Sequence, residues 1–416
     1  MNKDPYLAFR YPEFRYFISA TFLLTTALLI QEVVIGYELY RVTHDPLAIG
    51  IVGLVEAIPF IGLSLFGGHF ADRVSKKKLI LIAMGGIFLS SMFLHFYTTD
   101  TMREKLSQAE LLTGIYITIF MIGVLRAFYS PAATALRAFL VPRFVYENAT
   151  TWSSSAWQAG AIAGPMISGF LYAILGFSNT LFVVVALVAS AFILIFFIED
   201  KPIGTQIKHQ NIFSSFKEGI SFVFKTKIIL YSISLDLFSV LFGGVVAILP
   251  IFAEDILHVG AEGLGLLRSA PSIGAVITLM MLSRISPMKN AWRNLLIVVL
   301  SFGICILVFA LSKSMLLSLL ALFLSGAFDS VSVVIRSTIL QLMTPDELRG
   351  RVQAVNGMFL SSSNELGAFE SGLAAKLMGT IPSVVFGGTM TLVIVGWVYT
   401  RSKELFSIDL SSRQEM

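Results

Sequence analysis

Long, uninterrupted runs of apolar residues dominate the chain. Two examples are Leu79–Tyr97 and Leu181–Ile198. A helix needs about 20 mainly apolar residues to cross the hydrocarbon core of a bilayer. The runs do not alternate between apolar and polar residues, as the strands of a membrane barrel do. The pattern therefore predicts membrane-spanning helices.

Twelve such spans can be placed, separated mostly by short loops. They cover residues 16–40, 47–70, 79–98, 110–138, 151–176, 179–198, 228–252, 261–284, 294–312, 315–340, 350–378 and 381–401. The only long connection is 199–227. The predicted fold class is an all-α polytopic membrane protein with an N-terminal six-helix bundle (1–198), a cytoplasmic linker (199–227) and a C-terminal six-helix bundle (228–416).

Composition supports lipid as the solvent for most of the chain. Hydrophobic residues make up 56% and charged residues only 13% of the 416 residues, and the mean hydropathy is +0.81. Soluble domains carry about 25% charged residues, so a polar shell cannot be built here. The single cysteine, Cys305, excludes an internal disulfide. The start, Met1-Asn2-Lys3-Asp4, has no features of a cleavable signal peptide.

Basic residues predict the orientation. An even number of spans puts both termini on one side of the membrane. If that side is the cytoplasm, the outside loops hold only Arg41, Arg103, Lys105 and Lys313, and four further basic residues lie within spans. This leaves 22 of the chain's 30 basic residues inside, as the positive-inside rule requires. The net charge of +4 is thereby explained without a nucleic-acid partner.

The two halves look duplicated. At an offset of 203 residues, prolines, glycines and serines coincide at Pro142 and Pro345, Gly164 and Gly367, Ser168 and Ser371, and Gly176 and Gly379. Two related six-helix halves suit alternating access, in which one half rocks against the other around a central site. Within the linker, residues 211–224 predict an amphipathic helix at the membrane surface, with Ile220 and Phe224 among its apolar residues.

The loop after the second span carries the first specific motif. It reads Gly68-His-Phe-Ala-Asp72-Arg73-Val-Ser-Lys76-Lys77 and resembles the signature loop of the major facilitator superfamily, with departures at Phe70 and Ser75. The glycine is expected to let two helices approach closely. The resemblance implies a gating loop, and Asp72 is expected to dock near Arg351, at the cytoplasmic start of the eleventh span, and latch the outward-open state. The alternative is an ordinary basic loop.

The fifth span contains a second motif, with Gly160, Gly164, Pro165 and Gly169 at antiporter-motif spacing. It resembles the motif that marks exporters in the same superfamily, although generic small-residue helix packing is the alternative. Segments along nearly the whole chain, including Leu249-Pro-Ile-Phe-Ala253 and Gly263-Leu-Gly-Leu-Leu-Arg268, are similar to the bacterial branch that contains the enterobactin exporter and related drug and siderophore efflux proteins.

Ionisable residues inside spans are costly in lipid and are therefore candidate functional groups. The candidates singled out among them are Glu32, Arg126, Asp236, Asp329, Arg336 and Glu365. The resemblance implies that the spans of the first four line a central cavity. Arg336 lies two turns after Asp329 and shares its face, and Glu365 is expected to face the cavity or the second span. Glu32 and Asp329 are the candidate proton carriers, with Arg126 as modulator; permanent salt bridges are the alternative.

These features favour a secondary active transporter, expected to export an amphipathic drug or siderophore in exchange for protons. It is expected to act as a monomer in the bacterial inner membrane, without cofactor or metal. No phosphate-binding loop and no metalloprotease motif is present, so an ATPase or an intramembrane enzyme is disfavoured. The alternatives left open are an importer or facilitator of a nutrient or metal chelate, a lipid flippase, and a receptor that transports nothing.

Overall fold

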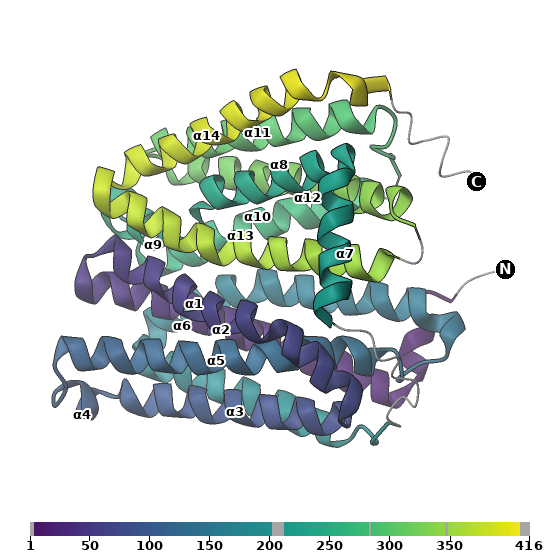
Figure 1. The fold of residues 1–416 in the computed structure, drawn as a ribbon. Coiled ribbons are helices and arrows are strands. Elements are labelled where there is room, and N and C mark those ends of the chain that lie inside the picture. Colours follow the sequence, from purple (N-terminus) through teal and green to yellow (C-terminus); the bar gives the residue numbers. More distant parts are fainter. Residues whose placement is uncertain (1–3, 202–211, 283, 346–347, 408–416) are drawn as a thin grey trace. The chain divides into compact units, whose positions relative to one another are not determined.

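The computed structural model describes residues 4–201, 212–282, 284–345 and 348–407, and the regular structure in these ranges is helical (Figure 1). The predicted all-α class is confirmed. Contacts within the chain define two compact units. The first comprises Met1–Val42 and Val55–Lys208, and the second comprises Thr43–Leu54 and His209–Met416. The first turns of helix α2 (Pro46–Arg73) thus belong to the second unit, although the spans alone place them in the N-terminal bundle.

The helices up to Phe196 are α1 (Pro12–Thr43), α2 (Pro46–Arg73), α3 (Lys76–Tyr97), the short α4 (Asp100–Arg103), α5 (Gln108–Arg137) and α6 (Tyr146–Phe196). Local signals set several helix starts. Ser107 and Glu110 form a reciprocal capping box at the start of α5, and Ser75 accepts a hydrogen bond from the backbone N–H of Lys78 at the start of α3. Each cap satisfies backbone donors that a helix start leaves unpaired.

The remaining helices are α7 (Ile212–Lys225), α8 (Lys227–Gly243), the one-turn α9 (Leu249–Ile251), α10 (Gly260–Leu282), α11 (Ala291–Leu311), α12 (Met315–Met343), α13 (Arg349–Met378) and α14 (Thr380–Arg401). The buried core of the second unit centres on Trp292, Ile229 and Leu295, which are at most 2% exposed. The Trp292 indole N–H donates to the Ser402 hydroxyl at 3.0 Å, so its one polar group is satisfied.

Ten helical segments in the described ranges are long and apolar enough to span a membrane. One of them, Arg143–Phe196, has 54 residues and contains a break: Gly176 has φ +77°, which ends one helix and starts the next. It therefore holds two spans. α13 has 30 residues but a more polar composition and falls outside the ten. With these two additions the twelve predicted spans are consistent with the structure.

The internal repeat is visible in the backbone. Gly379, between α13 and α14, has φ +93° and corresponds to Gly176 at the predicted offset. Glycine adopts these positive φ values at little steric cost. A second pair of glycines at the same offset, Gly164 and Gly367, agrees as well. A Cβ on Gly164 would meet the backbone of α1, and a Cβ on Gly367 would meet the backbone of α8. Equivalent helices therefore approach closely in both halves.

The linker helix packs on its own unit. Val223 in α7 is 1% exposed and belongs to the core of the second unit, and Gly219 sits against the backbone of Arg351 in α13. Phe224, predicted on the membrane-facing side, is 60% exposed. The predicted amphipathic helix is present, with one side packed on protein. The residues before Ile212 lie outside the described ranges.

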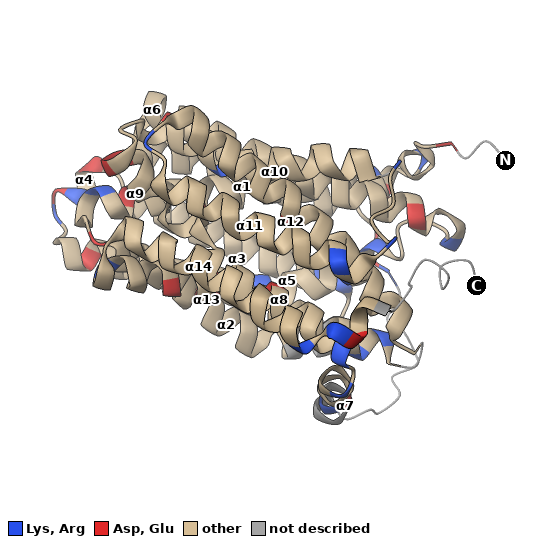
Figure 2. Ribbon diagram, turned by 90° about the horizontal axis from the view of Figure 1, so that it is seen from above, with Lys and Arg blue, Asp and Glu red and all other residues tan. Residues whose placement is uncertain are grey.

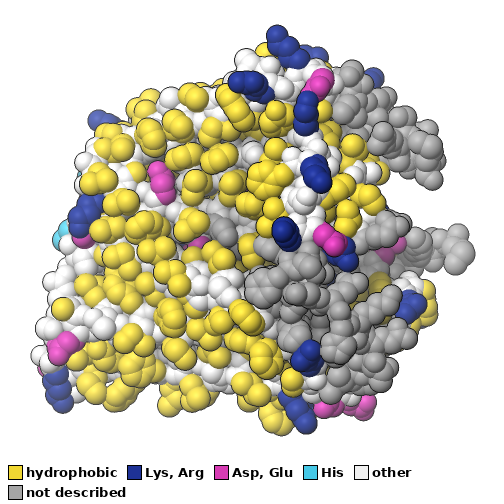
Figure 3. Space-filling model, in the orientation of Figure 1, with side chains coloured by type: hydrophobic (Ala, Val, Ile, Leu, Met, Phe, Trp, Pro, Cys, Tyr) yellow, Lys and Arg dark blue, Asp and Glu magenta, His cyan; other side chains and the backbone are white. Residues whose placement is uncertain are grey.

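Apolar side chains also cover the outside of the helices. Ile174, Leu316 and Leu377 are each more than 70% exposed, and Figure 3 shows hydrophobic side chains over most of the face in view. Charged residues lie mostly near helix ends, with few along the helix middles (Figure 2). Such a surface suits lipid contact along the helices and water at their ends. The protein is a multi-pass membrane protein.

Candidate functional site: intramembrane charges and a pocket in the second unit

Three of the predicted intramembrane charges meet in the second unit. The Arg336 guanidinium of α12 forms an ion pair with Asp236 of α8, and its other terminal nitrogen lies 3.8 Å from the Asp329 carboxylate. Arg336 Nε also donates to the hydroxyl of Ser332 at 3.1 Å. Arg336 and Asp236 are under 10% exposed, whereas the Asp329 side chain is 48% exposed. Arg336 and Asp236 carry opposite charges, so the buried pair has no net charge. Asp329 is a second carboxylate beside a single guanidinium.

A small pocket lies beside this cluster, between α8, α11 and α12, with room for about one water molecule. Both carboxylates line it, together with Ser239, Ser332 and the rings of Phe302 and Phe328; valines complete the wall. Asp236 and Ser239 are three residues apart on α8, and Asp329 and Ser332 are three apart on α12, so each pair shares a helix face. The sequence spacing predicted the Asp329–Arg336 neighbourhood, but not the contribution of α11.

The first unit holds another intramembrane ion pair. Arg126 of α5 pairs with Glu56 of α2, and its guanidinium lies 5.7 Å over the Phe60 ring. Glu56 is 13% exposed and Arg126 39%. The pairing of Glu56 with Arg126 was not predicted from the sequence. Glu32, the predicted proton carrier of this unit, is exposed on α1.

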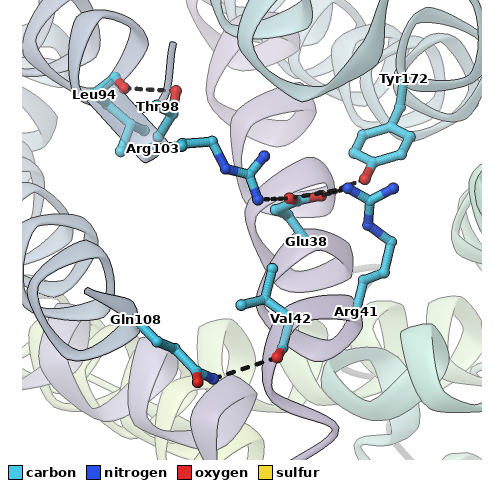
Figure 4. Close-up of polar contacts among 8 residues, drawn as sticks. All are labelled: Glu38, Arg41, Val42, Leu94, Thr98, Arg103, Gln108 and Tyr172. Carbon is cyan, nitrogen blue, oxygen red and sulfur yellow. Dashed lines mark hydrogen bonds and ion pairs between the residues drawn. The ribbon is translucent and has the colours of Figure 1, made fainter. Parts of the chain in front are cut away.

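A buried carboxylate that sequence reasoning missed altogether is Glu38 of α1. It is 2% exposed and accepts from Arg103 at 2.6 Å, from Arg41 at 3.2 Å and from the Tyr172 hydroxyl (Figure 4). The distribution of basic residues predicts only that Arg41 and Arg103 lie in outside loops. The available signal in the sequence was a glutamate six residues after Glu32 in the same span, followed three residues later by Arg41. The cluster joins the ends of α1 and α4 to the turn of α6 just before its break at Gly176.

The predicted gating loop contacts the residues around the end of α6. Ser75, one of its departures from the superfamily pattern, donates to the Asp200 carboxylate besides capping α3. Lys77 donates to the Phe196 carbonyl at 3.0 Å, and the ammonium of Lys76, which is 5% exposed, lies 5.1 Å over the Phe139 ring. Arg73 is exposed. The loop is thereby tied to the chain segment after α6.

The close helix approach predicted at Gly68 occurs one residue earlier. A Cβ on Gly67 would collide with the Ala127 carbonyl of α5, whereas a Cβ on Gly68 would meet nothing within 4 Å. The prediction was therefore wrong in its residue, because helix phase places Gly67 on the side facing α5.

The predicted contact between Asp72 and Arg351 can be followed for Arg351 alone. Arg351 pairs with Glu218 of α7, a partner that sequence reasoning missed. The side chain of Asp72 lies outside the described residues, so its docking near Arg351 stays a prediction.

The antiporter-like motif packs α6 on α1. A Cβ on Gly160 would lie 3.0 Å from Thr25, and one on Gly164 would lie 2.8 Å from Cβ of Leu29. Pro165 is inside the helix, where it provides no backbone donor, and its carbonyl accepts from the Ser168 hydroxyl at 2.6 Å. Gly169 is buried on the same helix. The small residues thus let the two backbones approach, as expected of a small-residue motif in a membrane.

Another small-residue contact lies at the start of α2, where Gly50 and Gly372 of α13 approach so closely that a Cβ on Gly372 would lie 2.7 Å from Cα of Gly50. Beside it, Lys376 donates to Asp45 at 2.6 Å. Burial alone would raise the pKa of Asp45, but the Lys376 ammonium and the Leu47 backbone N–H lower that pKa below its ordinary value. Glu365, on α13, is half-buried.

A repeated six-helix pattern with buried ion pairs along the membrane spans is typical of one class of helical membrane protein, the secondary transporters. Residues 16–368 match the Major Facilitator Superfamily, and the chain belongs to this family. Members of this class transport solutes, so the protein is a transporter and not an enzyme.

Relatives and solved structures agree with this placement. The chain is 25% identical over 394 residues to the enterobactin exporter EntS of Citrobacter koseri, covering 93% of this chain and 90% of that protein. It is also 25% identical over 393 residues to EntS of Shigella flexneri, covering 92% and 90%. A crystal structure of a POT family transporter in complex with 5-aminolevulinic acid aligns with TM-score 0.74 at 14% identity, covering 95% of this chain and 96% of that one. The nucleoside transporter NupG aligns with TM-score 0.72 at 14% identity, covering 94% and 100%. These structural likenesses concern the fold alone.

Proposed function

We propose that this protein is a proton-coupled exporter that moves an amphipathic small molecule, a drug or a siderophore, outward across the bacterial inner membrane by alternating access. The observation that carries the proposal is the likeness to EntS exporters over more than nine-tenths of the chain. The spacing of Gly160, Gly164 and Pro165, which resembles the antiporter motif, also favours export. Both termini lie in the cytoplasm in this proposal, and the two bundles, 1–198 and 228–416, alternate in exposure.

Coupling requires a carboxylate whose proton affinity changes as its surroundings change. Asp329 is the stronger candidate in the second unit, because Asp236 is already neutralised by Arg336, while Asp329 is half exposed beside a pocket. In the first unit the candidate is Glu32, which is exposed on α1. Arg126 acts there through its ion pair with Glu56. The loop at Gly68–Lys77 gates the cycle, with Asp72 as latch.

Inside-out vesicles with an imposed pH gradient, acidic inside, test export and coupling together. Accumulation is measured for a panel of fluorescent dyes and siderophores, with and without an ionophore that collapses the gradient. We expect at least one compound to accumulate only while the gradient persists. Asp329→Asn and Glu32→Gln are compared with Glu104→Gln, an exposed carboxylate in the α4–α5 connection. Accumulation that is unaffected by the ionophore would contradict proton coupling, and accumulation of solutes in right-side-out vesicles would indicate import.

A further inference from the structure

The cluster around Glu38 holds one more cation than its carboxylate can balance. Glu38 is 2% exposed, and Arg103 of α4 is its closer ionic partner, at 2.6 Å. That ion pair by itself cancels the charge of the carboxylate. Arg41 contacts the same carboxylate at 3.2 Å, and its side chain is 49% exposed, against 26% for Arg103. The cluster therefore carries a net positive charge, and Arg41 is its more accessible cation.

Arg41 is held in place although half of its side chain is exposed. Its guanidinium lies 5.7 Å from the centre of the Tyr172 ring, and this ring packs edge-on against Tyr37 at 4.9 Å. The Tyr172 hydroxyl donates to Glu38, so one carboxylate orients both the ring and the guanidinium (Figure 4). Each nitrogen of a guanidinium carries N–H donors. Within the described part of the chain only Nη2 of Arg41 meets an acceptor, which leaves Nε and Nη1 available to a ligand.

Apolar surface adjoins this end of the helices. Phe93 and Phe96, in the last turns of α3, are 48% and 57% exposed, and α4 follows them directly. On α6, the largely exposed Ile174 comes two residues after Tyr172. Aromatic side chains gather where the acyl chains of a bilayer meet the headgroups. Arg41, near the end of α1, is thus placed at the depth of the headgroups.

The charge and the donor geometry select the ligand. A planar guanidinium matches the oxygen atoms of a phosphate, and hydrogen bonds between these two groups are among the strong ones. The Glu38 carboxylate already accepts from three side chains, so it is not available to the ammonium of a zwitterionic headgroup.

We infer that Arg41, backed by the charge of Arg103, binds the phosphate of an anionic phospholipid of the phosphatidylglycerol type. In the topology predicted from the basic residues, this lipid belongs to the outer leaflet of the membrane. Its acyl chains lie along the apolar surface that includes Phe96 and Ile174. The inference goes beyond the proposed export function and does not depend on it.

Binding is tested on the purified, delipidated full-length chain in detergent. Native mass spectrometry gives the dissociation constant of dioctanoyl phosphatidylglycerol. Arg41→Gln is expected to weaken binding about tenfold, because a charged hydrogen-bond donor is lost. Glu38 keeps Arg103 and the Tyr172 hydroxyl as partners in this variant. Lys105→Gln is the matched control, since Lys105 is an exposed cation near Arg103 that does not contact Glu38, and binding should not change.

Arg41→Lys supplies a test that preserves the net charge. An ammonium keeps the attraction to a phosphate but loses the planar fork of donors, so the lipid should bind several-fold more weakly than to wild type. Arg143→Lys is the control for this exchange, because Arg143 is an exposed arginine beyond the opposite end of α5. This pair keeps the inference testable if Arg41→Gln misfolds.

Competing probes distinguish a lipid from a soluble phosphate. Inorganic phosphate and glycerol 1-phosphate should displace the lipid only at far higher concentrations, because they lack acyl chains. Displacement at concentrations equal to that of the lipid would overturn the lipid assignment in favour of a site for soluble phosphate. Dioctanoyl phosphatidylcholine that binds as tightly as phosphatidylglycerol, or an equal loss in Lys105→Gln, would overturn the inference. Lipid binding that depends on Arg41, with no gradient-driven transport of any compound, would support the lipid site and contradict only the exporter proposal.

Discussion

At the residue scale, the buried charges of this transporter depend on partners from other helices. Glu38 is nearly inaccessible, yet two guanidinium groups and a phenol satisfy it. Asp236 is neutralised by Arg336 in the same manner. A buried ion whose partner is removed is strongly destabilising, because its desolvation is then uncompensated. Single charge-neutralising substitutions therefore report on packing as well as on transport.

The Glu38 cluster gives the first prediction. Glu38→Gln keeps the side-chain shape but removes the charge that accepts from Arg103 and Arg41. We expect the free energy of unfolding to fall by about 1.5–3 kcal/mol, the range for hydrogen bonds to charged groups. Thermal unfolding of the purified protein measures this, with the exposed Glu104→Gln as control. Equal unfolding midpoints for Glu38→Gln and wild type would show that the cluster contributes nothing to stability.

The second prediction concerns pH and the Asp45–Lys376 pair. Because the folded-state pKa of Asp45 is lowered, its stabilisation is present above the ordinary carboxyl pKa of about 3.9 and is lost as pH falls through the lowered value. Both side chains are more than a third exposed, so the pair contributes at most about 1 kcal/mol.

Asp45→Asn should therefore lower the unfolding midpoint slightly at pH 7, and the difference from wild type should shrink toward pH 3. Thermal scans of the two proteins across this pH range measure the difference. A difference that grows on acidification would contradict the assignment.

At the element scale, glycines decide how closely helices approach. Gly67 of α2 faces the backbone of α5, Gly164 of α6 faces α1, and Gly367 of α13 faces α8. In a membrane, where lipid competes equally for apolar surface, such close backbone contact is a main source of helix association. The repetition of these contacts in both halves explains why small residues recur at the same offset.

Two adjacent glycines of α2 make this testable. Gly67→Ala should destabilise the protein by about 1–3 kcal/mol, because its Cβ would collide with the Ala127 carbonyl. Gly68→Ala should be neutral or slightly stabilising, since its Cβ meets nothing and alanine is the better helix former. Thermal unfolding and expression level compare the two variants. A larger loss for Gly68→Ala would indicate that the loop motif needs its glycine for a reason other than helix contact.

At the scale of the whole molecule, twelve spans and the basic bias predict both termini in the cytoplasm. A background with Cys305→Ser removes the single native thiol, which is buried. Single cysteines are then placed at the exposed positions Lys105, predicted outside, and Lys289, predicted inside. A membrane-impermeant maleimide should label Lys105→Cys in intact cells and Lys289→Cys only after permeabilisation. The reverse pattern would invert the topology and with it the proposed direction of transport.

The sequence by itself determined the all-α class, the consistent set of twelve spans, and the repeat marked by Gly176 and Gly379. These features are local, because a span is an apolar run of sufficient length and a helix break is a property of one glycine. Only the tertiary structure decided the partners of the charges: Glu56 for Arg126, Glu218 for Arg351, and the three donors of Glu38. It also decided that Ser239 and Phe302 join Asp329 around one pocket. Such neighbours lie on different helices, and their contact depends on the rotation and packing of each helix, which no periodicity along the chain specifies.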